Sequence, residues 1–424
     1  MASFHSIPEQ GSDPATVLAE LEERRHGDLR WREGRAFSLV YNAGPEALSL
    51  ASESYARFAT ENMLNLDAFP SLRLLQSELM SMVAPLLGGD DSTVGVFTAG
   101  GTESILTAVH GAKNWGLARG ITEPRMVLPT TAHAAFSKAA SYFGLESVRV
   151  RVDAGYRADV SAMAAAVDDR TVLLVASAPS YPQGVIDPIA DLGEVAAAND
   201  TLFHVDACMG FTLPWLEQLG LVRTAWNFAV PAVTSMSCDL HKYGYAAKGA
   251  SVLLHRDKAL RRHQFFVTED WLGGRYGSPA ILGTRSGGGL AGAWAMFVHL
   301  GAEGYRRLAA DAFEARCRIE AAVRSIPGLE VRGHPDTTLL AFGAVTGGDG
   351  QPAFDVFAVA DRLSEVGGWF VDRQQPPDSL HMTVNAVHRG FVEEFVTDLR
   401  SCVADVTARS GARGDPTRGY GTLS

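Results

Sequence analysis

The sequence predicts an α/β protein, in which a large domain built on a mostly parallel sheet precedes a small α+β carboxy-terminal domain. Between about residues 126 and 255, short apolar runs alternate with helical patterns, an order typical of parallel strands joined by right-handed crossovers. After the Gly-rich segment 283–289 the pattern changes to one long helical stretch followed by short strands. A chain of 424 residues also exceeds what a single core usually holds. We therefore divide it into an amino-terminal arm (1–70), a large domain (71–290) and a small domain (291–424).

Each predicted element rests on its own apolar pattern. The strands of the large domain are short apolar runs at Met126–Pro129, Val148–Val152, Thr171–Ala176, Leu202–Asp206, Ala232–Ser237 and Ala250–His255. Helical periodicity separates most of them, as at Val160–Val167 and Ile189–Asn199. In the small domain we expect a long helix near Ala291–Ala322 and strands around Leu329–Arg332, Thr338–Phe342, Trp369–Val371 and His381–Val384. Residues 410–424, rich in Gly, Arg, Ser and Thr, are expected to be mobile.

Bulk composition excludes several classes of protein. The net charge of -11 and the absence of a Lys/Arg run argue against nucleic-acid binding. Apolar runs stay shorter than the roughly eighteen residues of a membrane span. The first residues are of mixed polarity, so we expect no secretion signal. Four cysteines without a CxxC pair indicate reduced thiols, and together these features predict a cytoplasmic protein.

The segment 234–248 carries the strongest chemical signal. Lys242 directly follows His241, on the turn that leaves an apolar strand. An enzyme that holds pyridoxal phosphate needs its Schiff-base lysine in such a place, because cationic or desolvating surroundings supply the unprotonated amine. Taken alone, a lysine after a strand is more often a solvated charge.

Asp206 ends the predicted strand 202–206, at the carboxyl edge where open α/β sheets bind ligands. A buried carboxylate there keeps the ring nitrogen of pyridoxal phosphate protonated, which the cofactor needs to accept electrons. Two alternatives compete with this interpretation. Asp206 could cap the next turn, or His204 and Asp206 could ligate a metal, although no further His/Cys/Glu cluster completes such a site.

A third segment, Phe97–Ser104, opens a helix. Gly100 and Gly101 permit close approach of the backbone, and Thr102 adds a hydroxyl at the helix N-terminus. Free N–H groups and the positive end of the helix dipole make this a cradle for a phosphate group. A Gly-Gly turn is common, but in this order with Asp206 and Lys242 it predicts a pyridoxal-phosphate site.

These segments together resemble the fold-type I pyridoxal-phosphate enzymes of the group II decarboxylase branch, and most closely the sphingosine-1-phosphate lyase family. The resemblance runs from about Phe37 to His388 and is carried by 100–106, 132–143, 184–188, 204–208, 241–245, 264–266 and Trp369. It implies a mostly parallel, seven-stranded sheet in the large domain, pyridoxal 5'-phosphate as cofactor, a small-molecule amine as substrate, and a homodimer with composite active sites.

The resemblance also assigns cofactor contacts. His133 matches the histidine that stacks on the pyridine ring, and His241 faces the cofactor phosphate. Strand alternation puts Ser235 and Ser237 on one face, so we expect at least one of them, with Ser237 preferred, to assist by hydrogen bonding. Thr284, next to Arg285, matches a segment that reaches the cofactor phosphate of the partner subunit; the plain alternative is a Gly-rich loop with a solvated arginine.

Substrate handling falls to other residues in the resemblance. Tyr181, and after it Tyr41, is expected to relay the proton of a hydroxyl beta to the amine, and Lys248 to supply a charge for an anionic group. Asn65 stands where the family has a histidine that helps bind the substrate phosphate. The missing charge-assisted contact amounts to about 1.5–3 kcal/mol.

The sequence therefore predicts a pyridoxal-phosphate-dependent carbon–carbon lyase. Its reaction is retro-aldol cleavage of a (phosphorylated) 2-amino-3-hydroxy substrate, such as sphingosine 1-phosphate, to an aldehyde and phosphoethanolamine. An amino-acid decarboxylase on the same scaffold, or a related aldolase of specialised metabolism, is the alternative. A cofactor-binding scaffold without catalysis is a further one, which Asp206, His133 and Lys242 argue against.

Overall fold

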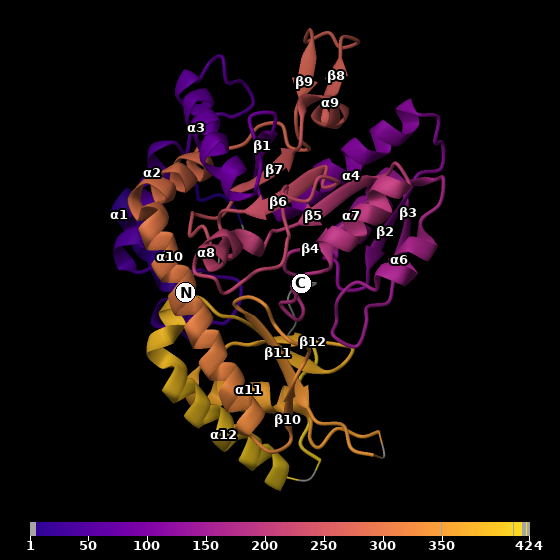
Figure 1. The fold of residues 1–424 in the computed structure, drawn as a ribbon. Helices are drawn as coiled ribbons and strands as arrows, with labels where there is room; N and C mark the ends of the chain where they lie inside the picture. Colours follow the sequence, from indigo (N-terminus) through magenta and orange to yellow (C-terminus); the bar gives the residue numbers. More distant parts are fainter. Residues whose placement is uncertain (1–5, 349, 410, 418–420, 422–424) are drawn as a thin grey trace.

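The large domain is centred on a seven-stranded sheet, as predicted, in a computed structural model that describes residues 6–348, 350–409, 411–417 and 421 (Figure 1). The strand order is β1-β7-β6-β5-β4-β2-β3. The strands are β1 (Val94–Thr98), β2 (Arg125–Pro129), β3 (Glu146–Val150), β4 (Thr171–Ser177), β5 (Leu202–Asp206), β6 (Ser235–Asp239) and β7 (Ser251–His255). Neighbours from β3 to β6 run parallel, and β7 runs antiparallel to both β1 and β6, so the sheet is mostly parallel.

Helices pack against this sheet and bury its strands. They are α4 (Gly101–Ala118), α5 (Ala135–Phe143), α6 (Val160–Ala166), α7 (Ile189–Ala198) and α8 (Leu213–Gln218), followed after β7 by the short α9 (Lys258–Arg261). β4, β6 and β7 are buried at every position. β4 and β7 accordingly read as nearly continuous apolar runs, whereas β6 carries three buried polar side chains, Ser235, Ser237 and Asp239.

The arm and one long helix connect the two sheets of the molecule. The arm contains α1 (Pro14–Glu23) and α2 (Pro45–Arg57) and leads to α3 (Pro70–Leu86). Helix α10 (Gly288–Ser325) includes one non-helical residue, Gly301, with φ 54° and ψ -177°. Its first part packs with α2, α3 and α8, and its second part packs with the elements of the small domain (Figure 1).

The small domain has an antiparallel sheet of order β10-β11-β13-β12. Its elements are β10 (Leu329–Val331), β11 (Leu339–Ala344), β12 (Asp372–Gln374), β13 (Ser379–Thr383), α11 (Val356–Gly367) and α12 (Val392–Ala408). The strand predicted at Trp369–Val371 was wrong, because the ladder begins at Asp372. Trp369 instead fills the core, where its indole N–H donates to Asp398 at 2.8 Å.

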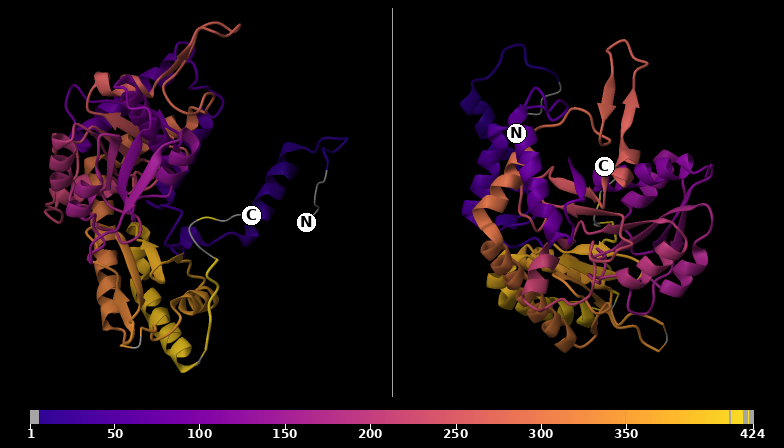
Figure 2. Two further views of the ribbon diagram at one scale, coloured as in Figure 1. Left: turned by 90° about the vertical axis from the view of Figure 1, so that its right-hand side faces the viewer. Right: turned by 45° about the horizontal axis from the view of Figure 1, so that its top comes forward.

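Sequence patterns missed β1 and a hairpin formed by β8 (Phe266–Thr268) and β9 (Tyr276–Ser278). All three strands are short. The two hairpin strands are also largely exposed, so in them no buried face leaves an apolar pattern. The hairpin extends from the large domain, and α1 extends away from the body of the molecule (Figure 2). No residue of α1 is buried.

In the part of the chain that the structure describes, no helix is long and apolar enough to cross a membrane. Two sequence expectations concern residues outside that part. One is the absence of a secretion signal in the first residues, of which 1–5 are not described. The other is the mobility of the tail, of which residues 410, 418–420 and 422–424 are not described.

Candidate active site

A cavity of about 520 Å³ opens at the carboxyl ends of β5 and β6, beside the N-terminus of α4. Residues that are far apart in the sequence line it, among them Gly100, Gly101, Thr102, His133, Asp206, Cys208, Asp239, His241, Lys242, Lys248, Ile281 and Leu282. Its volume lies in the range of cofactor and small-molecule sites. The predicted cradle, carboxylate and lysine therefore share one cavity.

Lys242 lies on the turn that follows β6 and forms an ion pair with a carboxylate of that strand. Its Nζ is 2.9 Å from Oδ2 of Asp239, whose side chain is 3% exposed. Burial works against ionisation of Asp239, but Lys242 and then His241 outweigh it, so the pKa of the carboxyl is lowered. The pair holds the lysine amine at the cavity wall next to a permanent negative charge.

Asp206 ends β5 and is anchored on one oxygen. Its Oδ1 accepts the backbone N–H of Cys208 at 3.0 Å and the hydroxyl of Ser237 at 3.3 Å. His204, which shares the strand, is directed to β6, where its Nδ1 and Nε2 contact the hydroxyls of Ser235 and Ser237. Burial lowers the pKa of His204 to about 4, so it is a neutral ring that orders these strands.

The described residues contain no group of three or more His, Cys, Asp or Glu side chains placed to hold a metal ion. His204 and Asp206 also have the hydrogen-bond partners given above. The carboxylates that line the cavity, Glu103, Asp206 and Asp239, are therefore not grouped as metal ligands.

The N-terminus of α4 closes the cavity at the side of Lys242. A Cβ at Gly101 would come within 2.8 Å of both carboxylate oxygens of Asp239, so only glycine lets the helix start this close to the lysine. Glu103 accepts the backbone N–H of Ala99 at 2.6 Å and of Leu282 at 2.8 Å. The first N–H groups of a helix lack partners within it and present a positive end to an anion.

His133 follows β2 and lies in the same cavity. Its Nδ1 accepts the backbone N–H of Ala135 at 3.1 Å, which places the ring proton on Nε2. Burial lowers its pKa, and the charge of Asp206 only partly opposes this. The ring is therefore neutral and apolar in character, as stacking on an aromatic cofactor requires.

These residues fit pyridoxal phosphate. The cofactor has an aldehyde, an aromatic ring with a basic nitrogen, and a phosphate. The cavity offers an amine at Lys242, a neutral ring at His133, a carboxylate at Asp206 and a helix N-terminus at Gly100 and Gly101. Because a Cβ at Gly101 would meet Asp239, the cradle is formed by bare backbone at this position. A Cβ added at Gly100 would lie 3.7 Å from the His241 ring, so this ring packs against the glycine. Nδ1 of His241 contacts the Ala250 carbonyl at 2.7 Å.

Lys248, Tyr41 and Tyr181 form a second group of candidate residues. Lys248 lines the cavity, donates to the Leu39 carbonyl at 2.8 Å and places its Nζ 5.1 Å from the centre of the Tyr41 ring. Partial removal from water, followed by the charge of Lys242, lowers the pKa of Lys248 to about 8. Tyr41 in turn interacts electrostatically with Tyr181, whose phenol donates to Asp372 at 2.5 Å.

Other predicted residues do not line the cavity within one chain. Asn65 is exposed, and its Oδ1 accepts the backbone N–H groups of Asp67 and Ala68 at 2.9 and 3.3 Å. The Thr284 hydroxyl accepts from Asn62 at 3.3 Å, and the guanidinium of Arg285 donates to the carbonyls of Leu282 and Gly283. Ser235 faces His204 rather than the cavity. The arm segment and the 284–286 loop nevertheless lie side by side, joined by the Asn62–Ser286 bridge.

Sequence reasoning missed the two carboxylates that contact predicted site residues. Asp239 stands three positions before Lys242 in the segment 234–248, so this spacing could have indicated the ion pair. Asp372 lies on β12 of the small domain and reaches Tyr181 only through the tertiary fold. No local pattern marks it.

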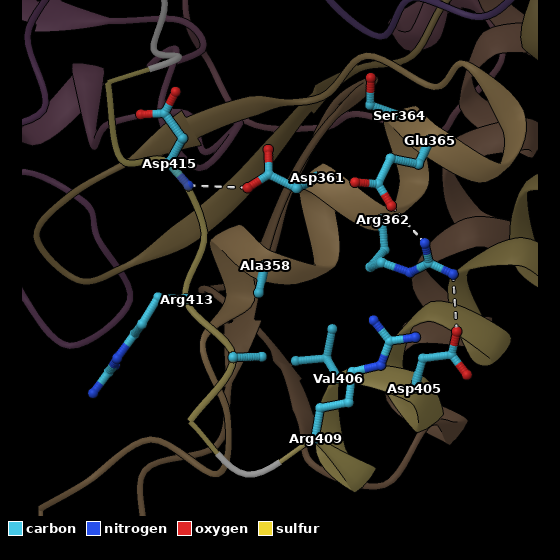
Figure 3. A pocket seen from close by; sticks show the side chains of 11 residues that line it. Ala358, Asp361, Arg362, Ser364, Glu365, Asp405, Val406, Arg409, Arg413 and Asp415 are labelled. Atoms are coloured by element: carbon cyan, nitrogen blue, oxygen red, sulfur yellow. Dashed lines mark hydrogen bonds and ion pairs between the residues drawn. The ribbon is translucent and has the colours of Figure 1, made fainter.

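A second cavity, of about 490 Å³, lies where the tail crosses α11 and α12 (Figure 3). Its charged side chains are largely paired with one another. Arg362 pairs with Glu365 and Asp405, and the backbone N–H of Asp415 donates to Asp361 at 3.0 Å. None of the predicted site residues lines it, so the cavity beside Lys242 is the candidate active site.

Comparisons with known proteins agree with this geometry. The conserved domain of pyridoxal-dependent decarboxylases matches residues 28–345. The chain is 40% identical over 405 residues to a sphingosine-1-phosphate lyase of Arabidopsis thaliana, an alignment that covers 93% of this chain and 73% of that protein.

Solved structures give the same picture. A sphingosine-1-phosphate lyase from Burkholderia pseudomallei is 39% identical, with a TM-score of 0.90 over 96% of this chain and 94% of that one. A glutamate decarboxylase of Lactobacillus brevis reaches a TM-score of 0.82 at 19% identity over 96% of each chain. The second likeness concerns the fold alone.

Proposed function

Because this chain belongs to the sphingosine-1-phosphate lyase family, within the pyridoxal-dependent decarboxylases, we propose that it cleaves a phosphorylated 2-amino-3-hydroxy substrate of the sphingosine 1-phosphate type. It is a pyridoxal-phosphate-dependent lyase. The products of the proposed reaction are a long-chain aldehyde and phosphoethanolamine. Solved structures named as glutamate decarboxylases share this fold at below 20% identity, which disfavours the decarboxylase alternative.

The observation that carries the proposal is the group of Lys248, Tyr41 and Tyr181. Lys248 lines the cavity with Lys242, whereas Tyr41 and Tyr181 do not line it and are connected to it through Lys248. A retro-aldol reaction needs a proton acceptor for the hydroxyl that becomes the aldehyde. Two neighbouring phenols, one of them beside an ammonium group, meet that need. An ammonium at the cavity wall also suits an anionic group of the substrate.

Bound pyridoxal phosphate supplies an aldehyde that condenses with amines and a ring that accepts the electron pair of a broken bond. Lys242 presents the amine that holds the cofactor, and Asp239 stabilises this amine when it is protonated and released. Asp206 keeps a proton on the ring nitrogen through its negative charge. His133 covers the ring and excludes water, while the N-terminus of α4, with His241 and Thr102, binds the phosphate.

We propose that Tyr181 removes the proton of the substrate hydroxyl and that Tyr41 orients the same group. Lys248 binds the substrate phosphate as a point charge. Asn65 adds a neutral hydrogen bond: its Oδ1 is engaged by the backbone of 67–68, so its Nδ2 is the group that remains to donate.

The head group of the substrate is tested by comparing matched pairs of compounds. We expect aldehyde release from phosphorylated 2-amino-3-hydroxy alkanes with a kcat/KM at least about tenfold above that of their dephosphorylated forms, as one charged hydrogen bond provides. In the same assay, Asn65→His should improve kcat/KM for the phosphorylated member only. A preference of the wild type for the dephosphorylated compound, together with loss of activity in Asn65→His, would reject the phosphate assignment.

The pKa of Lys248 gives this recognition a pH dependence. Lys248 carries its charge below about pH 8 and loses it above, whereas a phosphate monoester with a second pKa near 6 stays doubly charged. We expect KM for the phosphorylated substrate to rise as the pH passes 8, and Lys248→Ala to raise KM by about tenfold at pH 7. Lys248→Arg should keep KM constant across this range. The dephosphorylated compound is the control, since its amine titrates in the same way; an equal rise in its KM would contradict the assignment.

We propose that the active enzyme is a homodimer in which each subunit contributes Thr284 and Arg285 to the site of the other. Ile281 and Leu282 line the cofactor cavity and are exposed, and the nearby hairpin exposes Trp271 and Leu272. Helix α1 likewise exposes apolar side chains. A second copy of the chain would cover these surfaces next to the cavity.

Mixing two inactive variants tests the composite site. Lys242→Ala and Arg285→Ala are each expected to be inactive alone. If Arg285 serves the partner's cavity, one site of the mixed dimer carries both changes and the other carries none, so activity returns after subunit exchange. If Arg285 serves its own cavity, each site stays defective and the mixture stays inactive. A monomer in solution would overturn the dimer itself.

We further propose a cytoplasmic location. The four cysteines are unpaired thiols, and Cys208 and Cys238 are buried in the site region. Unpaired thiols are stable in a reducing compartment.

A further inference from the structure

A buried carboxylate lies behind the phenol that the proposed reaction uses. Asp372, on β12, is inaccessible to solvent and accepts hydrogen bonds from the Tyr181 phenol at 2.5 Å and from the Ser38 hydroxyl. These three residues come from the arm, from the large domain and from the small domain. Among the described residues, no lysine or arginine forms an ion pair with Asp372, and its Oδ1 has no hydrogen-bond partner. Tyr181 and Ser38 are therefore the hydrogen-bond donors that reach this carboxylate.

The hydrogen bond fixes the direction of the phenol proton. Because Tyr181 donates its only proton to Asp372, any other group that hydrogen-bonds its oxygen must be the donor, and the Ser38 hydroxyl is one group near it. Burial, followed by the charge of Asp372, raises the pKa of Tyr181 well above 10. A free phenolate is therefore inaccessible at neutral pH, and Tyr181 acts as a base only if its own proton moves on as it accepts another.

The other groups around Tyr181 do not replace Asp372 in this role. The His381 ring lies 4.1 Å from the Tyr181 ring, between centroids, and its nitrogens contact the Pro182 carbonyl and the Thr383 hydroxyl. Burial lowers the pKa of His381 to about 4, so it is neutral. Tyr41 is a second phenol that interacts electrostatically with Tyr181 and is not a carboxylate.

We propose that Asp372 is the proton acceptor behind Tyr181, so that the two residues act as a relay during carbon–carbon cleavage. This inference rests on the proposed lyase function. The substrate O–H bond breaks as its proton joins the Tyr181 oxygen, and the phenol O–H bond breaks as its proton joins Oδ2 of Asp372. The electron pair of the broken carbon–carbon bond stays with the carbon that bears the amine, and the C–O bond becomes the aldehyde C=O. After the aldehyde leaves, the proton returns from Asp372 through Tyr181 to that carbon, so no proton is gained or lost.

Asp372 does not touch the substrate in this account, so it is a positioning and relay residue. A double-mutant cycle identifies such a role. Tyr181→Phe and Asp372→Asn are each expected to lower kcat by about a hundredfold or more, as for loss of a general base, with KM within about threefold. The double variant should be no worse than Tyr181→Phe by more than about twofold, because both changes break one relay. Losses that multiply would overturn the proposal.

Asp361→Asn is the matched control. Asp361 is also a carboxylate of the small domain, and it pairs with Arg373, the neighbour of Asp372, at 2.6 Å. Its change should leave kcat near that of the wild type. If it lowers kcat as much as Asp372→Asn does, disturbance of the small domain explains both, and the relay is rejected.

Two further measurements test the proposal. The first serves if Asp372→Asn folds poorly, and the second serves if the substrate class is wrong. In single turnovers of the wild type, a proton inventory should be curved, since two protons move together; a linear inventory would reject the relay. The second needs no turnover. Difluorotyrosine at position 181, followed by fluorine NMR, should ionise at lower pH in Asp372→Asn than in the native background, because a neighbouring negative charge is removed. Equal titration in both would show that the carboxylate does not hold the phenol proton, whatever reaction the enzyme performs.

Discussion

Lys242→Ala is expected to abolish turnover by several orders of magnitude and to destabilise the cofactor-free protein. Turnover is lost because no other amine takes the place of Lys242 at the end of β6. Stability is lost because Asp239, with its side chain 3% exposed, keeps a charge whose partner is gone. Breaking a buried pair from one side lowers the free energy of unfolding by about 3–5 kcal/mol. Denaturant unfolding of both proteins without cofactor measures this difference.

A second variant separates the two effects. Lys242→Ala combined with Asp239→Asn removes the stranded charge, so most of the free energy of unfolding should return while turnover stays absent. In the wild type, borohydride should fix the cofactor to Lys242, because reduction makes the bond between its aldehyde and a lysine permanent. Peptide mapping that finds the label on another lysine would refute the assignment.

Asp206→Asn is expected to lower kcat by about a hundred- to a thousandfold, comparable to the loss of one preorganised electrostatic group. The amide keeps the shape of the carboxylate, and its oxygen still accepts from the Cys208 N–H and from Ser237. Only the negative charge that holds the ring proton is lost. The cofactor should therefore still bind, which its absorbance reports, while kcat at saturating cofactor falls.

Ser237→Ala is the control for Asp206. It removes the hydrogen bond to Asp206 at 3.3 Å, together with the contacts of Ser237 with His204 and Cys208, and leaves the charge in place, so kcat should fall by less than about tenfold. If Asp206→Asn turned over at a similar rate, the charge would not be what the site requires.

Features encoded locally were predictable from the sequence. β4 and β5 are apolar and buried along nearly their whole length, so composition alone identified them. Asp206, Lys242 and the Gly100–Gly101 cradle each occupy the end or the beginning of an element, where a short motif fixes both position and chemistry. The order of these motifs along the chain then indicated a cofactor class.

Features that depend on contacts between distant segments were not predictable in this way. Tyr181 and Asp372 are 191 positions apart, and their contact exists only because the small domain packs against the large one. The strand expected at Trp369–Val371 failed for a related reason: an aromatic residue suits both a strand and a core, and the core of the small domain took Trp369. Asn65 and Thr284 do not line the cavity within one chain, and the second copy proposed above is not placed by one sequence.

Cleavage of a carbon–carbon bond next to a hydroxyl is measured directly through its products. Purified enzyme loaded with pyridoxal phosphate, incubated with a phosphorylated 2-amino-3-hydroxy alkane, should release aldehyde and phosphoethanolamine in equal amounts, and Lys242→Ala should release neither. Parallel incubations with amino acids should release no carbon dioxide. Carbon dioxide from an amino acid, with no aldehyde from any 2-amino-3-hydroxy compound, would contradict the account.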